Sequence, residues 1–464
     1  MTPAARAPWY ARIPHPLIML FGIVVTVAAL TYVLPAGHYA RTEVDGRMLV
    51  VPGSYAPVAA TPVGFLQLFR AFPEGYRVAT PIIFICLASA LMFSVFRETR
   101  TIENAVGRLL YRLGRGRAEL VLVLLTLFYG LLGIMVGYEN NIALIPIAAV
   151  VVLALGGDLV LAAGVSAGGM TVAFGLSPIN PYTIGIGHEI AGLPVFSGAG
   201  LRTVLCSCAL ALTAAYNVRY YRRIRRNPAG AIGAGLDEGG LALARPLADY
   251  RVGRRDWLLL AIFVVGLGGV LWGVFNYGWF IDDISAVFLV VFVACAAVSG
   301  LSLGRIAAAA MAGIAEISPA TFIIGMAATV KVILEQGQIQ DTISYGLAQA
   351  LGGLPTYLSA IGMSLGQSGL NLLIPSGSGQ ALATLPVMIP LGEALGLSRQ
   401  VAILAFQIGD GVTNLFNPSL GGLIAMLSLC RVPFDRWLRF VLPLTGALLL
   451  LAWAGLLVAV ATGY

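Results

Sequence analysis

The chain has 464 residues, of which 59% are hydrophobic and only 11% are charged, and its formal net charge is +7. A soluble domain of this length needs more polar surface than this composition supplies, so we predict an all-α polytopic membrane protein. The positive charge comes almost entirely from arginines, which cluster at the ends of apolar runs. We interpret these clusters as orientation signals and expect no nucleic-acid partner.

The first apolar run, residues 17–34, follows Arg6 and Arg12 and is expected to be a retained span. By the positive-inside rule the N-terminus is then cytoplasmic, and the polar connection 35–77 lies outside. A second span, over residues 78–96, returns to an arginine-rich segment that we expect to be cytoplasmic and interfacial.

Two features of the first repeat, residues 1–226, depart from simple spans. Residues 120–155 form two apolar arms around a polar tip, and the second arm has about fourteen residues where a span needs about twenty. This pattern predicts a re-entrant hairpin, with two short spans joined by a loop as the alternative. Residues 160–196 contain Pro178 and Pro181, which cannot both lie in one uninterrupted helix, so a discontinuous transmembrane helix is predicted.

A polar linker over residues 227–256, expected to be cytoplasmic, separates this repeat from residues 257–464. The second part is expected to hold a linking span and then a repeat with a hairpin over 356–395 and a discontinuous helix over 400–430. The segment before this hairpin carries no lysine or arginine, so the hairpin is expected to enter from the outside. Simple spans are expected over residues 257–275, 284–303, 319–334 and 440–460.

Residues 374–418 echo residues 137–181. Pro386 corresponds to Pro146, and the pair Asn417-Pro418 corresponds to Asn180-Pro181. A single linking span between the copies reverses the second relative to the first, which predicts two inverted-topology repeats. Hairpins that enter from opposite faces then bring their tips together near the middle of the membrane.

The two tips and the two helix breaks form the candidate site. Helices that begin at the tips direct backbone N–H groups toward an anion, while carbonyl oxygens freed at the breaks suit a cation such as Na⁺. No catalytic residue and no cofactor is expected. The substrate-binding candidates are Glu139, Asn140, Asn141, Asn180, Ser376, Gly377, Ser378, Gly379, Gln380 and Asn417. The coupling-ion candidates, for Na⁺ or H⁺, are Ser177, Asn180, Asp410, Thr413, Asn414 and Asn417.

Asp410 and Glu139 are the acidic members of this set. An ionised carboxylate in the hydrocarbon layer costs about 3 kcal/mol or more unless it is paired or hydrated, so each is a functional candidate. Either residue would bind sodium, carry a proton or hold a substrate amine. The alternative is a solvated carboxylate at the rim of a water-filled vestibule.

Several motifs together resemble the four-carbon dicarboxylate anaerobic carrier family, particularly its YfcC-type branch. They are Leu34-Pro35-Ala36-Gly37, residues 375–380 (Pro-Ser-Gly-Ser-Gly-Gln), Ser398-Arg399-Gln400, Gly409-Asp410-Gly411 and residues 414–418. The resemblance covers nearly the whole chain. It implies membership of the ion-transporter superfamily, two inverted repeats with opposed hairpins, a homodimer and elevator-type movement. At the first tip the chain departs from that branch, because Glu139-Asn140-Asn141 stands where paired acids followed by threonine are usual.

These observations predict a secondary active transporter in the bacterial cytoplasmic membrane. The expected substrate is a small carboxylate-bearing metabolite, either a dicarboxylate or an amino acid, moved together with Na⁺ or H⁺. An exchanger of basic amino acids is the alternative. A channel and an intramembrane enzyme are remote alternatives, because the polar residues gather in two patches and the chain has no His-Glu-x-x-His or Gly-x-Ser-x-Gly motif.

Overall fold

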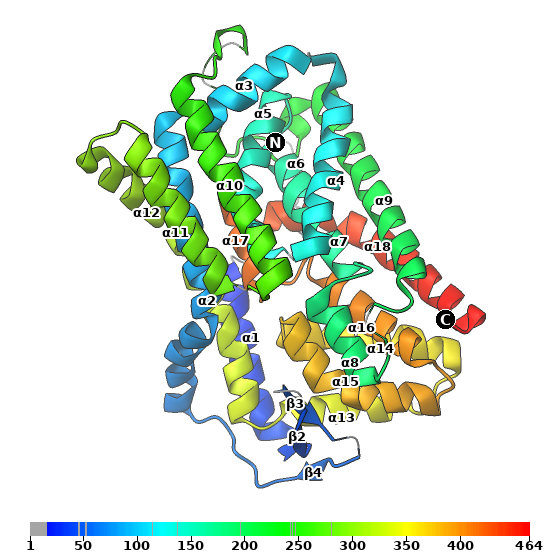
Figure 1. The fold of residues 1–464 in the computed structure, drawn as a ribbon. Helices are drawn as coiled ribbons and strands as arrows, with labels where there is room; N and C mark the ends of the chain where they lie inside the picture. Colours follow the sequence, from blue (N-terminus) through cyan, green and yellow to red (C-terminus); the bar gives the residue numbers. More distant parts are fainter. Residues whose placement is uncertain are drawn as a thin grey trace, which may run out of the picture.

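A computed structural model describes residues 16–44, 47–51, 53–113, 115–136, 138–194, 196–241, 243, 245, 247–279 and 281–464 of the chain. The structure is built mainly from helices (Figure 1). Up to the linker these are α1 Pro16–Val33, α2 Phe65–Thr99, α3 Thr101–Leu113, α4 Ala118–Val136, α5 Ile145–Ala154, α6 Leu159–Ala163, α7 Gly169–Gly175, α8 Ile186–Ala191 and α9 Ala199–Arg226. Short 3-10 turns cover Arg115–Arg117, Glu139–Leu144, Pro228–Gly230 and Leu247–Asp249, and π-helical turns cover Gly164–Gly168 and Pro181–Gly185.

The second part of the chain begins with α10, Arg254–Tyr277. It continues with α11 Ile281–Val298, α12 Leu303–Gln336, α13 Gln340–Leu351, α14 Thr356–Leu373, α15 Gly377–Ala394, α16 Arg399–Thr413, α17 Gly421–Leu429 and α18 Phe434–Thr462. Five helices of the described chain are long and apolar enough to cross a membrane: α2, α9, α11, α12 and α18.

The structure is mainly helical, but it also contains four short strands within residues 37–57, which the prediction of an all-α protein did not include. Strands β1 (Gly37–His38) and β4 (Ala56–Pro57) pair antiparallel, as do β2 (Arg41–Val44) and β3 (Arg47–Val50). They lie at one end of the molecule, here called the strand end (Figure 1). The sequence predicts only a polar connection here, because its short strands lack a clear alternation of apolar and polar residues.

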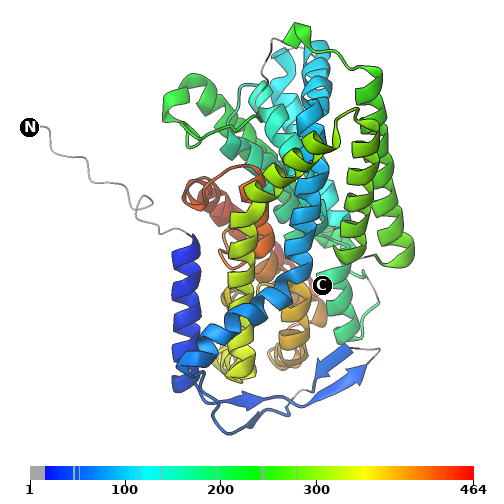
Figure 2. The ribbon, with the colours of Figure 1, turned by 90° about the vertical axis from the view of Figure 1, so that its left-hand side faces the viewer.

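Helices α2 and α12 are longer than predicted, and they lie side by side (Figures 1 and 2). The connection expected over 35–77 ends at Gly64, because Leu68, Ala71 and Phe72 recur at helical spacing and pack into an apolar cluster with α1 and the end of α12. Likewise the span expected over 319–334 is only the second half of α12, since Pro319 lies inside that helix without ending it.

The order of helices in the first part recurs in the second. Helices α1 to α4 have 18, 35, 13 and 19 residues, and α11 to α14 have 18, 34, 12 and 18. In each part a pair of helices around a polar tip then precedes an interrupted helix. The pairs are α4 with α5 and α14 with α15, and their ends lie within a few residues of the helix pairs expected over 120–155 and 356–395. The pair α4 and α5 lies toward the end of the molecule opposite the strands, and the pair α14 and α15 lies toward the strand end (Figure 1). Whether the two parts are inverted relative to a membrane stays a prediction.

The two interrupted helices pack against each other at a pair of glycines. A methyl group built on Gly175 at the end of α7 would lie 2.6 Å from the carbonyl carbon of Gly411 in α16. Gly409, two residues before Gly411 in α16, faces α14. A methyl group built on Gly409 would lie 2.5 Å from Cβ of Gln367. Side chains larger than hydrogen would separate these backbones, so the glycines set how closely both breaks approach.

Candidate functional site

The second tip and the two helix breaks meet around Gly377. A methyl group built on this residue would lie 2.7 Å from Cγ2 of Thr183, 3.3 Å from Oδ2 of Asp410 and 3.8 Å from Cζ of Phe174. Gly377 is the first residue of α15, Asp410 lies in α16, and Thr183 follows the first break. Asp410 is 1% exposed. The structure therefore places a carboxylate beside the N-terminus of an 18-residue helix, whose backbone N–H groups favour negative charge.

A stripe of polar side chains on α14 continues this site. Gln367 and Asn371, one turn apart, are fully buried. Gln380 donates to the Oε1 of Gln367 at 2.7 Å, and Gln367 donates to Oγ1 of Thr384 at 3.0 Å. These bonds tie the two helices of the second hairpin together immediately behind its tip.

The second break is fastened to the same stripe. The amide of Asn371 donates to the carbonyl oxygen of Asp410 and to Oδ1 of Asn414, both at 2.7 Å. Asn417 donates to the carbonyl oxygen of Asn371 at 2.7 Å, while its Oδ1 accepts from the backbone and hydroxyl of Ser419. Asn417 thus uses both its amide nitrogen and its amide oxygen to hold the break.

The first break joins three elements. The carbonyl oxygen of Ser177 accepts from Gln407 of α16 at 2.6 Å, and its hydroxyl donates to the carbonyl oxygen of Ile134 on α4 at 3.4 Å. Asn180 begins the next helical segment, since its Oδ1 accepts from the backbone N–H groups of Tyr182 and Thr183.

Buried polar atoms without a hydrogen bond gather in this region. Within the described part of the chain, five of the buried atoms that make no hydrogen bond belong to the breaks and the second hairpin with α16: Asn180 Nδ2, Thr183 Oγ1, Asn371 Oδ1, Gln380 Oε1 and Gln407 Oε1. Each of these residues is at most 1% exposed. A buried polar atom without a partner costs about 1–3 kcal/mol, so these atoms need a ligand, an ion or bound water as a partner.

The first tip contributes to this region through aromatic contacts. Tyr138 packs edge-on against Phe174, with ring centroids 4.7 Å apart, and Phe174 in turn lies next to Gly377. Asn141 is buried and donates to the carbonyl oxygen of Leu132, 3.4 Å away. The side chains of Glu139 and Asn140 lie outside the described part of the structure, so their role stays a prediction.

The remaining predicted residues are spread around this centre. Thr413 and Asn414 are buried at the second break. Ser376 precedes α15, and its Oγ accepts from the backbone N–H of Gly379 at 3.2 Å, which makes it a helix cap. Ser378 is half-buried near the start of α15.

A vestibule of about 530 Å³ leads from the strand end to the second tip. Ser376 and Gly379 line it at the second tip, and the strand segment, the end of α12 and the starts of α13 and α15 also contribute. Its charged lining residues include Arg41, Lys331, Glu335 and Asp341. Lys331 and Glu335 lie 3.6 Å apart, and Arg41 lies 2.9 Å from Asp341. Each pair joins one positive and one negative side chain, so the charges of these four groups sum to zero.

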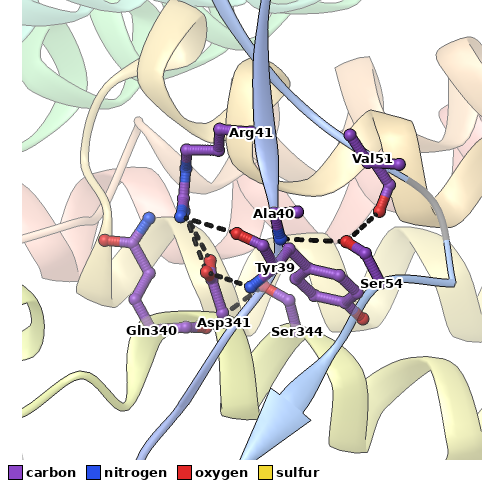
Figure 3. A network of polar contacts seen from close by, with 8 residues as sticks. All are labelled: Tyr39, Ala40, Arg41, Val51, Ser54, Gln340, Asp341 and Ser344. Carbon is purple, nitrogen blue, oxygen red and sulfur yellow. Dashed lines mark hydrogen bonds and ion pairs between the residues drawn. The ribbon is translucent and has the colours of Figure 1, made fainter. Parts of the chain in front are cut away.

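Asp341 of α13 holds the strand segment over this vestibule (Figure 3). Its Oδ2 accepts from the backbone N–H of Tyr39 at 3.0 Å, and both its oxygens lie 2.9 Å from the Arg41 guanidinium. The Arg41 guanidinium also donates to the carbonyl oxygen of Tyr39. Burial of Asp341 protects these bonds from competition by water.

We expect Asp341→Ala to release the strand segment. The buried charge-assisted bonds contribute about 1.5–3 kcal/mol, and Arg41 would lose its partner. Limited proteolysis should then cleave within the strand segment faster than in the wild type. Glu335→Ala, which removes only a largely exposed ion pair with Lys331, is the matched control and should leave the rate unchanged. Equal cleavage of Asp341→Ala and wild type would show that other contacts hold the segment.

Sequence reasoning missed Phe174, Thr183, Gln367, Asn371 and Gln407. A signal existed for three of these. Gln367 and Asn371, the two amide side chains of their arm, recur at helical spacing, and Gln407 lies one turn before Asp410 on the same helix. Phe174 and Thr183 carry no such signal, because only the packing of α7 against α16, and of the turn Pro181–Gly185 against α15, makes them neighbours of the second tip.

The chain is similar to two bacterial proteins over nearly its whole length. The relatives include a protein of Escherichia coli (strain K12), named as a proposed basic amino acid antiporter, YfcC, which is 29% identical over 496 residues, covering 97% of each chain. A Haemophilus influenzae protein without an assigned activity is 25% identical and covers 94% of this chain and 95% of its own.

Two of the solved structures to which the chain is similar are those of transporters. The YdaH transporter of Alcanivorax borkumensis is 18% identical with a TM-score of 0.46, covering 97% of this chain and 99% of its own. MtrF of Neisseria gonorrhoeae, described among antimetabolite efflux pumps, has the same identity and TM-score, covering 96% of this chain and 95% of its own. The sequence profile of the C4-dicarboxylate anaerobic carrier family matches residues 13–461. The chain therefore belongs to the C4-dicarboxylate anaerobic carrier family and is a membrane transporter, not an enzyme.

Proposed function

We propose that the protein is a secondary active transporter of a small carboxylate-bearing metabolite, a dicarboxylate or an amino acid, coupled to Na⁺ or H⁺ in the bacterial inner membrane. The observation that carries this proposal is the convergence of the second tip, the carboxylate of Asp410 and unsatisfied buried polar atoms at the helix breaks. Such a centre suits a ligand that is enclosed and released, as in carriers with broken helices.

The position of Asp410 gives a physical reason for coupling. A substrate carboxylate bound at the N-terminus of α15 would lie close to the Asp410 carboxylate. A methyl group built on Gly377, the first residue of α15, would lie only 3.3 Å from Oδ2 of Asp410. Two carboxylates at this distance repel strongly in a buried site unless a cation or proton lies between them. A dicarboxylate would need Na⁺ or H⁺ to bind there, whereas an amino acid would bring its own ammonium group.

Oxygen atoms around the second break suit the coupling cation. Asn371 Oδ1 makes no hydrogen bond among the described residues, and Asn371 also contacts Asn414 and the backbone of Asp410. Carbonyl and carboxylate oxygens of interrupted helices are the usual ligands of Na⁺ in such transporters.

The architecture supports a proposal for the transport movement. We infer an elevator mechanism in a homodimer, with the paired helices α2 and α12 in the scaffold and the hairpins with the interrupted helices in the moving unit. The recurring order of helices supports two inverted repeats. With the N-terminus cytoplasmic, the strand end lies outside and the vestibule faces the external solution.

Exchange of basic amino acids is the second candidate function. Two observations favour it: one relative of the chain is named as a proposed antiporter of this kind, and the charges lining the vestibule sum to zero. A neutral vestibule does not favour a dianion over a molecule that carries both charges.

Purified protein in liposomes tests the proposal. Counterflow of labelled malate, succinate, arginine and ornithine should show exchange without net flux for one class, since only a carrier exchanges substrate in this way. A thermal-shift series of the same compounds with and without NaCl should show stabilisation by the transported class. Conductive flux without counterflow would indicate a channel and would overturn the proposal. Counterflow of arginine that is independent of sodium would select the exchanger.

A further inference from the structure

A groove between α4 and α9 has an apolar floor and a basic rim. Its volume is about 1000 Å³. Val123 and Leu127 of α4 and Ala211, Ala214 and Ala215 of α9 line the apolar part, and the rim carries Arg219, Arg222, Arg223 and Arg226. The groove is separate from the candidate transport site, which lies around α15 and α16.

The two parts of the groove follow each other along α9. At 1.5 Å per residue, Ala211 and Arg219 are separated by about 12 Å along the helix, and Arg219 and Arg226 by about 10 Å more. An apolar groove with positive charge at one end matches a lipid, whose tail and headgroup are arranged in the same order. Helix α9 is one of the five helices that are long and apolar enough to span a membrane.

The arginines of the rim differ in whether they have an ion-pair partner. Arg222 forms two hydrogen bonds with Glu119 at the start of α4, at 2.9 and 2.6 Å. Arg219, Arg223 and Arg226 are exposed and form no ion pair within the described part of the chain. The rim therefore has an excess of positive charge that a phosphate group would complement.

We propose that this groove is a binding site for one anionic glycerophospholipid. Its acyl chain lies against Ala211, Ala215 and Leu127, and Arg219 and Arg223 hold its phosphate. The lipid covers the contact between α9 and α4, the first helix of the first hairpin, so it stabilises the arm that carries the first tip.

Thermal unfolding of the full-length protein in detergent tests this site. Phosphatidylglycerol added to the micelles should raise the melting temperature, and phosphatidylcholine should not. In the double variant Arg219→Gln/Arg223→Gln the apparent affinity for phosphatidylglycerol should fall about 30-fold, since each arginine near a charged lipid surface contributes about 1 kcal/mol. Arg225→Gln is the matched control, because Arg225 is exposed on α9 but does not line the groove.

Two further measurements separate the groove from general charge effects. Ala215→Trp fills the apolar part of the groove while leaving the arginines in place, and it should remove the phosphatidylglycerol effect without lowering the melting temperature in lipid-free detergent. Glycerol 3-phosphate should stabilise the wild type far less than the lipid. Equal stabilisation by both lipids, retention of the effect in the double variant, or equal loss in Arg225→Gln would overturn the proposal, as would stabilisation by glycerol 3-phosphate to the same extent.

Discussion

Asp410→Asn is expected to fold and to lose ion-coupled uptake. The substitution keeps the shape and much of the hydrogen bonding of the side chain but removes its charge beside Gly377 and Thr183. Substrate or ion affinity should weaken by about 10- to 150-fold, the range of a charge-assisted hydrogen bond of about 1.5–3 kcal/mol. Uptake and counterflow in proteoliposomes at varied NaCl concentration and pH measure the change.

The pattern of loss identifies the role of the carboxylate. Loss of sodium dependence indicates a sodium ligand, and loss of pH dependence with intact counterflow indicates a proton carrier. Weaker binding of arginine with unchanged or tighter binding of dicarboxylates indicates a partner for a cationic side chain. Glu393→Gln, which removes a partly exposed carboxylate paired with Arg399, is the control. Wild-type uptake, ion dependence and substrate preference in Asp410→Asn would remove this residue from the site.

Gly411→Ala and Gly175→Ala should each destabilise the protein and abolish transport. An added methyl group on Gly175 meets backbone atoms of Gly411 at 2.6–2.8 Å, and backbone cannot move aside as a flexible side chain can. Overpacking of this kind costs about 1–3 kcal/mol or more. The melting temperature should fall, and uptake should be lost because both breaks are displaced.

Gly369 of the neighbouring helix α14 provides the control for these substitutions. Gly369 lies inside α14, and a methyl group added there meets no atom within 4 Å. Gly369→Ala should therefore leave the melting temperature unchanged or raise it, since alanine is favoured over glycine in a helix by about 0.5–1 kcal/mol. If Gly175→Ala behaves like Gly369→Ala in both melting and uptake, close approach of α7 and α16 is not required for transport.

Several features of this protein were determined by sequence alone, because they follow from local physical chemistry. Two prolines close together at residues 178–181, and the Asn-Pro pair at residues 417–418, disfavour an uninterrupted helix, and both interrupted helices break there. The short apolar arms beside the tips predicted the helix pairs α4–α5 and α14–α15 within a few residues. The candidate role of Asp410 also came from sequence, since a carboxylate in an apolar stretch is costly. The chain's family could likewise be recognised from its motifs, and the family profile confirms it.

Only the tertiary structure decided which of these polar residues share a space. Asn417 and Asn180 correspond to each other in the predicted repeat, yet Asn417 bonds entirely to its own break and the second hairpin, while Asn180 has an amide nitrogen that makes no hydrogen bond within the described part of the chain. Thr183 and Phe174 became neighbours of Gly377 because the glycine pair 175 and 411 lets α7 and α16 approach closely. The small strands are a similar case, since Asp341, about 300 positions away in the chain, holds them in place. Contacts between distant segments depend on how whole helices pack, and no local pattern of residues encodes that packing.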